Sequence, residues 1–434
     1  MTSRSETIFT RAQAVLPSGY TRHLAVTKPH PQYAAAGAGC WITDVDGNRK
    51  IDFINNFAAL IHGHAHPAIT QLIAEQAGRL LSAILPTEWE VKLAELLVER
   101  IPSVEKVRFM NTGTEAVMLA VKVARANTGR SKVAKMEGGY HGQFDLIEAS
   151  FQPSPAEWGD PARPTPVAHS VGTPQSLLDE LILLPVNDLE NSRARLRAEA
   201  GNLAAVIIDP YRLQLGLVEP RLDYLAMLRE ETAQLGIVLI FDEVFCLRTS
   251  YHGTQGALGI TPDMTTMGKI VGGGMPIGAV GGSHQLMSVF EIERGEPKVK
   301  QSGTFTANPL STAAGYTGMS LLTPAAFDDL AAKGQRLRDG LERVLRDLRI
   351  TGRVEGRASF ASLLMTDRPM RNYREVAAIM ADGLGEKMQA FQKLLLAEGV
   401  ITMRGGFIGS TPMTNDDIDF AIEAVRRALV KLHA

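Results

Sequence analysis

Residues 237–243 read Ile-Val-Leu-Ile-Phe-Asp-Glu, five apolar residues followed directly by two acidic ones. An unbroken apolar run of this length is typical of a strand that is covered on both faces of a parallel sheet. Residues 204–208, Ala-Ala-Val-Ile-Ile, have the same character. Helical patterns alternate with such runs through the middle of the chain, and this alternation indicates an α/β fold with a mostly parallel sheet flanked by helices.

The organisation of the chain changes near Pro309. After this point two long helical patterns, each with one apolar face, enclose two short predicted strands at 359–365 and 400–403. Such a mixture is typical of a smaller α+β domain. We therefore expect three parts along the chain: an N-terminal segment that packs with the small domain (1–60), a large cofactor-binding domain (61–310) and a small α+β domain (311–434).

The composition excludes several classes of partner. The 434 residues include 45 Lys and Arg against 47 Asp and Glu, so the net charge of −2 provides no basic field for nucleic acid. No apolar run approaches the roughly 20 residues that a membrane-spanning helix needs, and residues 1–19 lack the pattern of a signal peptide. The two cysteines, Cys40 and Cys246, are too few for a disulfide framework. We expect a cytoplasmic protein with no nucleic-acid, membrane or metal partner.

Two charged residues follow strand-like runs. Asp242 stands at the carboxyl end of the apolar run, where α/β folds place their ligands, and a carboxylate buried there needs a cationic partner. That partner is either a ligand or a structural arginine, unless the carboxylate caps a helix. Lys269 precedes a cluster of glycines at 272–274. Glycine lets a planar ligand approach the backbone, and a desolvated lysine there could form a Schiff base with an aldehyde, although a solvated lysine beside plain turns fits the same pattern.

Two turns complete the candidate site. Residues 111–115, Asn-Thr-Gly-Thr-Glu, open a helix whose free N–H groups would bind a phosphate, or be capped locally. Tyr140, in Gly-Gly-Tyr-His-Gly at 138–142, would offer an aromatic face at another strand end, or serve only in packing. A phosphate site, a stacking face, a carboxylate and an amine are together what pyridoxal 5′-phosphate requires.

The residues of these motifs and their order along the chain resemble those of the class III aminotransferases of pyridoxal phosphate fold type I. The resemblance covers nearly the whole chain, and the motifs that carry it are Asn-Thr-Gly-Thr-Glu-Ala (111–116), Tyr-His-Gly (140–142), Phe-Asp-Glu-Val (241–244), Gly-Lys (268–269) and Ser-Gly-Thr-Phe (302–305). Within the class, the chain is most similar to the subgroup of glutamate semialdehyde aminomutase, β-phenylalanine aminotransferase and amine transaminases.

The resemblance implies a role for each matching residue. Lys269 would form the Schiff base with the cofactor and later move a proton, and Asp242 would pair with the ring nitrogen. Tyr140 would stack on one face of the ring, and Val244 would pack against the other. The phosphate would be bound by Thr112, Gly113 and Thr114, joined by Thr304 from the neighbouring subunit. An active site that is shared in this way implies a homodimer.

Two stretches depart from the family pattern. Asp209-Pro210 stands where many members have Glu-Pro. After Asp-Glu-Val the chain continues Phe245-Cys246-Leu247-Arg248, where relatives often have small or polar residues. Both stretches lie beside the expected cofactor residues and leave those residues intact, so they bear on the substrate more than on the type of reaction.

Two arginines are candidates for binding a substrate carboxylate, because a guanidinium can hold a carboxylate in a bidentate fork. By position, Arg22 matches the N-terminal arginine that binds carboxylate in the aminomutase and the β-amino acid enzymes. Arg404 matches a C-terminal arginine that some relatives use. Each could instead form a structural salt bridge. Tyr20, His23 and Phe57 complete the predicted substrate pocket.

The leading hypothesis is a transaminase that moves an amino group from a primary amine or β-amino acid to an α-keto acid such as pyruvate or 2-oxoglutarate by a ping-pong mechanism. The alternative is an isomerase on the same scaffold, either an aminomutase of the glutamate semialdehyde type or an amino-acid racemase. The turn-rich segment 151–174 resembles the gating segment of that aminomutase. A third possibility is a pyridoxal-binding protein that has lost catalysis, which the presence of Lys269 and Asp242 disfavours.

Overall fold

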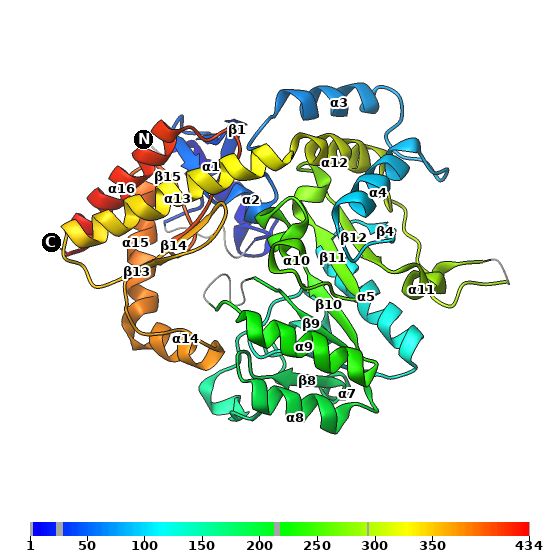
Figure 1. Ribbon diagram of the computed structural model, residues 1–434. Helices are drawn as coiled ribbons and strands as arrows, with labels where there is room; N and C mark the ends of the chain where they lie inside the picture. The colour runs from blue at the N-terminus through cyan, green and yellow to red at the C-terminus, as the bar shows by residue number, and fades with distance from the viewer. Residues whose placement is uncertain (1–2, 23–28, 212–217, 293–294, 434) are drawn as a thin grey trace.

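The computed structural model describes residues 3–22, 29–211, 218–292 and 295–433 (Figure 1). Its centre is a seven-stranded sheet, whose strands in spatial order are β4 (Lys106–Met110), β12 (Gly278–Gly282), β11 (Met264–Gly268), β10 (Val238–Asp242), β9 (Leu203–Ile208), β5 (Lys132–Met136) and β8 (Leu181–Leu184). Only β12 runs antiparallel to its neighbours in this sheet. The predicted α/β fold with a mostly parallel sheet is therefore confirmed.

Helices cover both faces of this sheet (Figure 1). Val238 and Ile240 of β10 belong to the apolar cluster that includes α5 (Gly113–Thr128), whereas Leu239 and Phe241 face the cluster that includes α9 (Leu222–Leu235). Every residue of β10 is buried, because successive side chains point into opposite layers that are both apolar. This double burial explains why the strand has no polar alternation in its sequence.

The C-terminal part of the chain is a smaller α+β unit. Its antiparallel sheet consists of β13 (Arg353–Glu355), β14 (Phe360–Leu364) and β16 (Gly406–Ile408). Three long helices, α13 (Pro324–Asp347), α15 (Gly385–Ala397) and α16 (Asn415–His433), lie together beside it in Figure 1. Thr323 caps the start of α13, because its side chain accepts a hydrogen bond from the Ala326 N–H at 3.3 Å.

The N-terminal segment shares a sheet with the C-terminal part. This sheet has the order β1 (Ala34–Ala38), β2 (Trp41–Asp44), β3 (Arg49–Asp52) and β15 (Val400–Ile401). β15 pairs parallel with β3, and the rings of Phe53 and Phe407 meet edge to face with centroids 5.4 Å apart. The exact division of the chain at residues 60 and 310 stays a prediction.

Some segments differ from what the sequence predicted. The strand expected at 400–403 is only two residues long, and the segment 151–174 contains a small hairpin of β6 (Gly159–Asp160) and β7 (Arg163–Pro164). A π-helical turn (Met380–Leu384), with Gly383 at φ 90°, joins α14 (Tyr373–Ile379) to α15.

The other helices are α1 (Arg4–Gln13), α2 (Asn55–Ala58), α3 (Pro67–Ala77), α4 (Glu88–Arg100), α6 (Asp145–Glu148), α7 (Gln175–Leu178), α8 (Leu189–Glu199), α10 (Gly253–Leu258), α11 (His284–Met287) and α12 (Pro309–Leu321). None of the described helices is both long and apolar enough to cross a membrane.

Candidate active site

Four segments that carry predicted site residues meet at one edge of the central sheet. α5 follows β4 directly, Tyr140 follows β5, Asp242 is the last residue of β10, and Lys269 comes directly after β11. The carboxyl ends of parallel strands lie at the same edge of a sheet, and this edge is where open α/β folds bind their ligands. The topology therefore brings an amine, a carboxylate, an aromatic ring and a helix N-terminus into one region.

Asp242 is a buried carboxylate with three hydrogen-bond donors. Its Oδ2 accepts from His141 Nδ1 at 2.8 Å, and its Oδ1 accepts from Thr266 Oγ1 at 2.9 Å and from the Val244 N–H at 3.2 Å. Burial by itself would raise the pKa of Asp242, but the hydrogen bond from His141 and the charges around it outweigh burial, so the pKa lies below its usual value. The site therefore contains a fixed negative charge.

The side chain of His141 is completely buried. Burial lowers the pKa of His141, although the neighbouring Asp242 works in the opposite direction. The proton must lie on Nδ1, since this nitrogen faces the carboxylate, and Nε2 is buried with no hydrogen-bond partner in the described part of the chain. A neutral imidazole that donates to Asp242 satisfies this geometry.

Lys269 begins the 3₁₀ turn after β11 and has a backbone φ of 47°, an unusual value for a residue with a side chain. Burial lowers the pKa of its amine, and the charge of Asp242, followed by that of Asp209, partly opposes this effect. No hydrogen bond or ion pair to the amine is found among the described residues. The amine is thus held in an apolar, partly screened position near Asp242.

The start of α5 has unused backbone donors. Thr112 is the N-cap, and its hydroxyl accepts from the Glu115 N–H at 3.1 Å, while the Glu115 carboxylate accepts from the Asn111 N–H at 2.6 Å. Within the described residues, the N–H groups of Gly113 and Thr114 have no partner. These groups and the positive end of the helix dipole form an anion site.

Two further contacts bring the ring-binding candidates next to this turn. A Cβ atom on Gly113 would lie 2.8 Å from a methyl carbon of Val244, so only glycine fits there. Tyr140 is 43% exposed and packs edge to face on Phe151, with the ring centroids 5.0 Å apart. Burial, helped by Asp242, raises the pKa of the Tyr140 hydroxyl. Tyr140 therefore keeps exposed surface at this edge of the sheet.

Thr304 does not join this group in the single chain. It is exposed in a turn that precedes α12 and has no hydrogen bond to the residues above in the described structure. The prediction that it reaches the phosphate of a neighbouring subunit stays a prediction.

Arg22 lies beside an unusual turn. Its guanidinium donates to Asn56 Oδ1 at 2.8 Å. Asn56 and Phe57 belong to α2, in which all four residues have φ between 49° and 72°. A left-handed turn of residues with side chains costs roughly 1–2 kcal/mol per residue, so other contacts must hold it, and one is a 2.6 Å hydrogen bond from Asn55 to the Ile408 carbonyl. Such strain is typical of functional sites.

Two other substrate candidates are less informative. Tyr20 is partly exposed at the end of the 3₁₀ turn Pro17–Gly19. His23 lies outside the described residues. The described residues do not test a role of Tyr20 or His23 in substrate binding, so both stay predictions.

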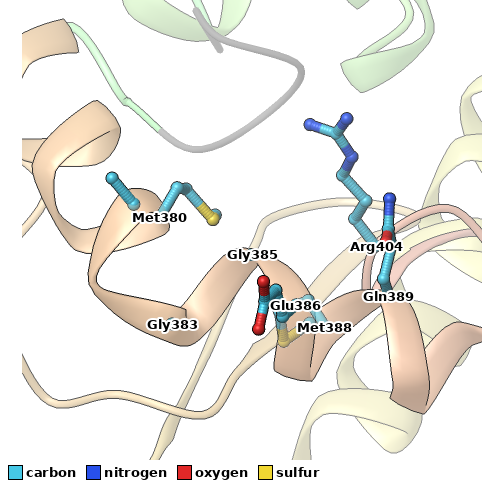
Figure 2. Close-up of a pocket in the computed structure, with 8 residues that line it drawn as sticks. Met380, Gly383, Gly385, Glu386, Met388, Gln389 and Arg404 are labelled. Carbon is cyan, nitrogen blue, oxygen red and sulfur yellow. The ribbon is translucent and has the colours of Figure 1, made fainter.

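Arg404 lines a half-open cavity of about 500 Å³ in the C-terminal part (Figure 2). Met380, Glu386 and Met388 contribute to the walls, and Lys269 does not. Figure 2 shows the Arg404 side chain extending away from Glu386, and among the described residues no acidic group lies within ion-pair distance of its guanidinium. The structure therefore places Arg404 and Arg22 on different elements without a contact that joins them.

Sequence reasoning missed two supporting residues. Thr266 donates to Asp242 because the two are paired across β10 and β11, and only the strand register reveals this pairing. Arg248 is fully buried and donates to the carbonyls of Ala58, at 2.9 Å, and Gly409. Burial lowers its pKa to about 9. No sequence signal distinguishes such an arginine from an exposed one.

Comparison with known proteins gives consistent results. The family model described as aminotransferase class-III matches residues 25–429. A glutamate-1-semialdehyde 2,1-aminomutase 2 from Halalkalibacterium halodurans is 35% identical over 433 residues, covering 99% of this chain and 98% of that protein. The structure of an omega-transaminase from Sphaerobacter thermophilus is similar with a TM-score of 0.96 and 43% identity, covering 100% of this chain and 98% of that one. A β-phenylalanine aminotransferase from Variovorax paradoxus has a TM-score of 0.86 and 32% identity, with 98% and 94% covered.

Proposed function

The chain belongs to the class III aminotransferase family, and from this premise we propose that it is a transaminase that takes the amino group of a primary amine or β-amino acid and delivers it to an α-keto acid. It is a pyridoxal-phosphate-dependent enzyme of fold type I, as the sequence motifs predicted. The observation that supports the transaminase proposal is the buried Lys269 amine, which has no hydrogen bond or ion pair within the described residues and interacts electrostatically with the buried Asp242 carboxylate. Pyruvate and 2-oxoglutarate are the acceptors that we expect.

The residues at the sheet edge fit this cofactor. The unused N–H groups of Gly113 and Thr114, with the hydroxyl groups of Thr112 and Thr114, suit a phosphate. Asp242 provides the negative charge that a protonated ring nitrogen needs, and its hydrogen bonds fix its orientation. Tyr140 is partly exposed, and its aromatic side chain would stack on the ring. When bound, pyridoxal phosphate supplies an aldehyde that bonds to amines and a ring that accepts electrons from the substrate carbon.

The protein's own groups provide the acid–base chemistry. Lys269 has a pKa below that of a solvated lysine, so a larger fraction of its amine is neutral at physiological pH and able to accept a proton. It is the residue that we expect to take the proton from the substrate carbon and to return it. Asp242 stays ionised and holds a proton on the ring nitrogen, because His141 and Thr266 stabilise its charge.

Arg22 is the residue that we propose for the substrate carboxylate. Its guanidinium is exposed and hydrogen-bonded only to a neutral amide, Asn56, in the described structure, so it can still pair with an anion. Asn56 lies two residues from Ala58, which packs with Phe245 in one apolar cluster. An apolar cluster and a carboxylate-binding group that both contact the same turn suit a β-amino acid. Arg404 is the second candidate for this role.

An isomerase is the second candidate function. Curated relatives that are 35–39% identical have the name glutamate-1-semialdehyde 2,1-aminomutase. The segment 151–174 begins at Phe151, which contacts the ring of Tyr140, and a cover over this ring would keep an intermediate in the site. The omega-transaminase, at 43% identity, supports transamination instead.

We also propose a homodimer, on the basis of an exposed apolar patch. Leu81, Ile84 and Leu85, in the segment between α3 and α4, are between 61% and 101% exposed, and Phe305 is 60% exposed. Asn308 donates to the Leu81 carbonyl at 3.0 Å, which places this segment next to the turn that holds Phe305. A patch of this kind is typical of a protein interface. A second copy that covers it would lie beside Thr304.

A panel of amino donors and keto acids tests the function. We expect a donor alone to give at most one equivalent of product per site, and pyruvate or 2-oxoglutarate to restore turnover. Continued turnover of one substrate without a keto acid would establish the isomerase instead. Repeating the panel with Arg22→Ala and Arg404→Ala identifies the carboxylate-binding residue, because only that variant should raise KM for carboxylate-bearing substrates, by about tenfold or more. Both variants should leave KM for simple amines unchanged.

A further inference from the structure

The ring of Phe245 lies between Lys269 and the C-terminal part of the chain. The Lys269 Nζ is 5.5 Å from the centroid of this ring, within the range of a cation–π contact. Phe360, from β14, packs on Phe245 with a centroid distance of 5.1 Å and an interplanar angle of 34°. Phe245 is only partly exposed, so its contact with the amine is shielded from bulk water.

The position of Phe245 is fixed by buried neighbours. The buried members of this apolar cluster are Ala58, Tyr211, Cys246, Phe360 and Ile408. Phe360 is held in turn by the Arg248 guanidinium, 5.6 Å from its ring centroid. Arg248 is fixed by its hydrogen bonds to the Ala58 and Gly409 carbonyls. The cluster therefore leaves Phe245 little room to turn away from the amine.

Two kinds of group act on the Lys269 amine: titratable side chains and an aromatic ring. The titratable groups near the amine are Asp242, Asp209 and Cys246. Burial raises the pKa of the Cys246 thiol well above its ordinary value, so only the two carboxylates carry a charge that acts on the amine. The face of the Phe245 ring also lies within cation–π range of the amine. A ring face attracts an ammonium group and does not compete for the lone pair of a neutral amine.

We propose that Phe245 is a positioning residue for Lys269, whose ring holds the lysine ammonium at the edge of the sheet whenever the amine is protonated and not bonded to the cofactor. This inference rests on the proposed function, in which Lys269 is the reacting amine. It adds a residue that holds the Lys269 ammonium after the substrate amine has replaced Lys269 at the cofactor. The aromatic ring, and not only its bulk, is required for this role.

The test compares the titration of Lys269 in full-length protein carrying pyridoxamine phosphate, which leaves the lysine unbonded. Cyanate carbamylates only the neutral amine, and peptide mass mapping gives the pH at which Lys269 is half reactive. The aromatic ring is removed in Phe245→Leu and Phe245→Met and kept in Phe245→Tyr. Phe290→Leu is the matched control, because Arg108 lies 4.8 Å from the centroid of that ring at a different place in the fold.

We expect the half-reactive pH to fall by about 0.5–1.5 units in both the Leu and the Met variants, because a shielded cation–π contact stabilises the protonated form. The Tyr variant and the Phe290→Leu control should stay within a few tenths of a unit of the wild type. An unchanged or higher value in the Leu and Met variants would overturn the proposal. Melting temperatures verify that each variant folds. If Phe245→Leu does not fold, the titration of Phe245→Met, whose side chain best preserves the volume of the ring, provides the test. Turnover without a keto acid would contradict the proposed function while leaving this titration result intact.

Discussion

Asp242 and His141 show at the scale of single residues how a charge is maintained inside the protein. A buried carboxylate is costly unless it is hydrogen-bonded, and here each oxygen has at least one donor. His141 contributes a donor without adding a positive charge, since burial keeps its ring neutral. The negative charge of Asp242 therefore stays available for a cationic ring nitrogen.

His141→Leu should weaken cofactor binding. Loss of the hydrogen bond raises the pKa of Asp242 and costs about 1–2 kcal/mol, which corresponds to about a 5- to 30-fold higher Kd for pyridoxal phosphate in an equilibrium titration. His141→Asn keeps an N–H near the position of Nδ1 and should stay within about threefold of the wild type. The exposed His284 provides a control through His284→Leu. An unchanged Kd in His141→Leu would contradict this role.

Some of the site residues could be predicted from the sequence, and others could not. Asp242 was predictable because it follows an apolar run and Lys269 because a glycine cluster follows it, and the sheet topology places both at the same edge of the sheet. The left-handed turn α2 was not predictable, because none of its four residues is glycine. Its conformation depends on contacts such as that of Asn55 with Ile408, which is 353 positions away in the sequence.

At the scale of elements, α14 anchors the segment 151–174. Arg374 on α14 pairs with Glu137 at 3.0 Å and donates to the carbonyls of Trp158, at 2.8 Å, and Gly159, at 3.0 Å. The Tyr373 hydroxyl donates to the Pro153 carbonyl at 2.6 Å. Glu137 directly follows β5 and precedes the turn with Tyr140, so α14 fixes both the segment and the base of that turn.

Arg374→Gln should release this segment. Breaking a mostly buried ion pair leaves Glu137 unpaired, so the open form becomes more populated. Chymotrypsin, which can cut after Phe151 and Trp158, should cleave the variant about tenfold faster or more in limited proteolysis. Arg371→Gln is the matched control, because Arg371, just before α14, forms an exposed ion pair with Glu375 of that helix. This variant should change the cleavage rate by less than about twofold. Equal rates for the two variants would refute the anchoring role.

Long elements were predictable from their periodic patterns, as in the case of α13, β9 and β10. The hairpin of β6 and β7 was not, since each strand has two residues and depends on the contacts of Arg374. The π-helical turn between α14 and α15 gives no periodic signal of its own. Short elements of this kind are fixed by tertiary contacts and not by local propensity.

At the scale of the whole molecule, His62 joins segments that are distant in the chain. One ring nitrogen lies 2.8 Å from the Gly318 carbonyl on α12, and the other lies 3.2 Å from Thr411 Oγ1 in the C-terminal part. Burial lowers the pKa of His62 to about 4. The unfolded chain has a histidine pKa near 6.5, so between these values the unfolded state binds more protons.

This difference predicts how stability depends on pH. The contribution of His62 is complete above about pH 6.5 and is lost as the pH falls through about 4, for a total of about 3 kcal/mol. His62→Gln keeps a hydrogen-bonding side chain that does not titrate, so its free energy of unfolding should fall less steeply over this range in urea titrations. The same acid slope in both proteins would show that His62 does not stay neutral in the folded state.

Segments that are distant in the chain meet near Lys269. Phe245, which follows β10, contacts both the Lys269 amine and Phe360 of the C-terminal sheet. The order of strands could be inferred only in general terms from the sequence, because the pairing of β3 with β15 spans almost the entire chain. Catalysis in this account depends on a single amine that this assembly holds near Asp242.

Replacing Lys269 by Ala tests that claim most directly. The measurement is the rate of product formation from an amino donor and a keto acid by the purified variant loaded with pyridoxal phosphate, with its melting temperature as the folding control. We predict that turnover falls by about a thousandfold or more, because the variant has lost the group that accepts and returns the proton. Full activity in a folded Lys269→Ala variant would contradict the account.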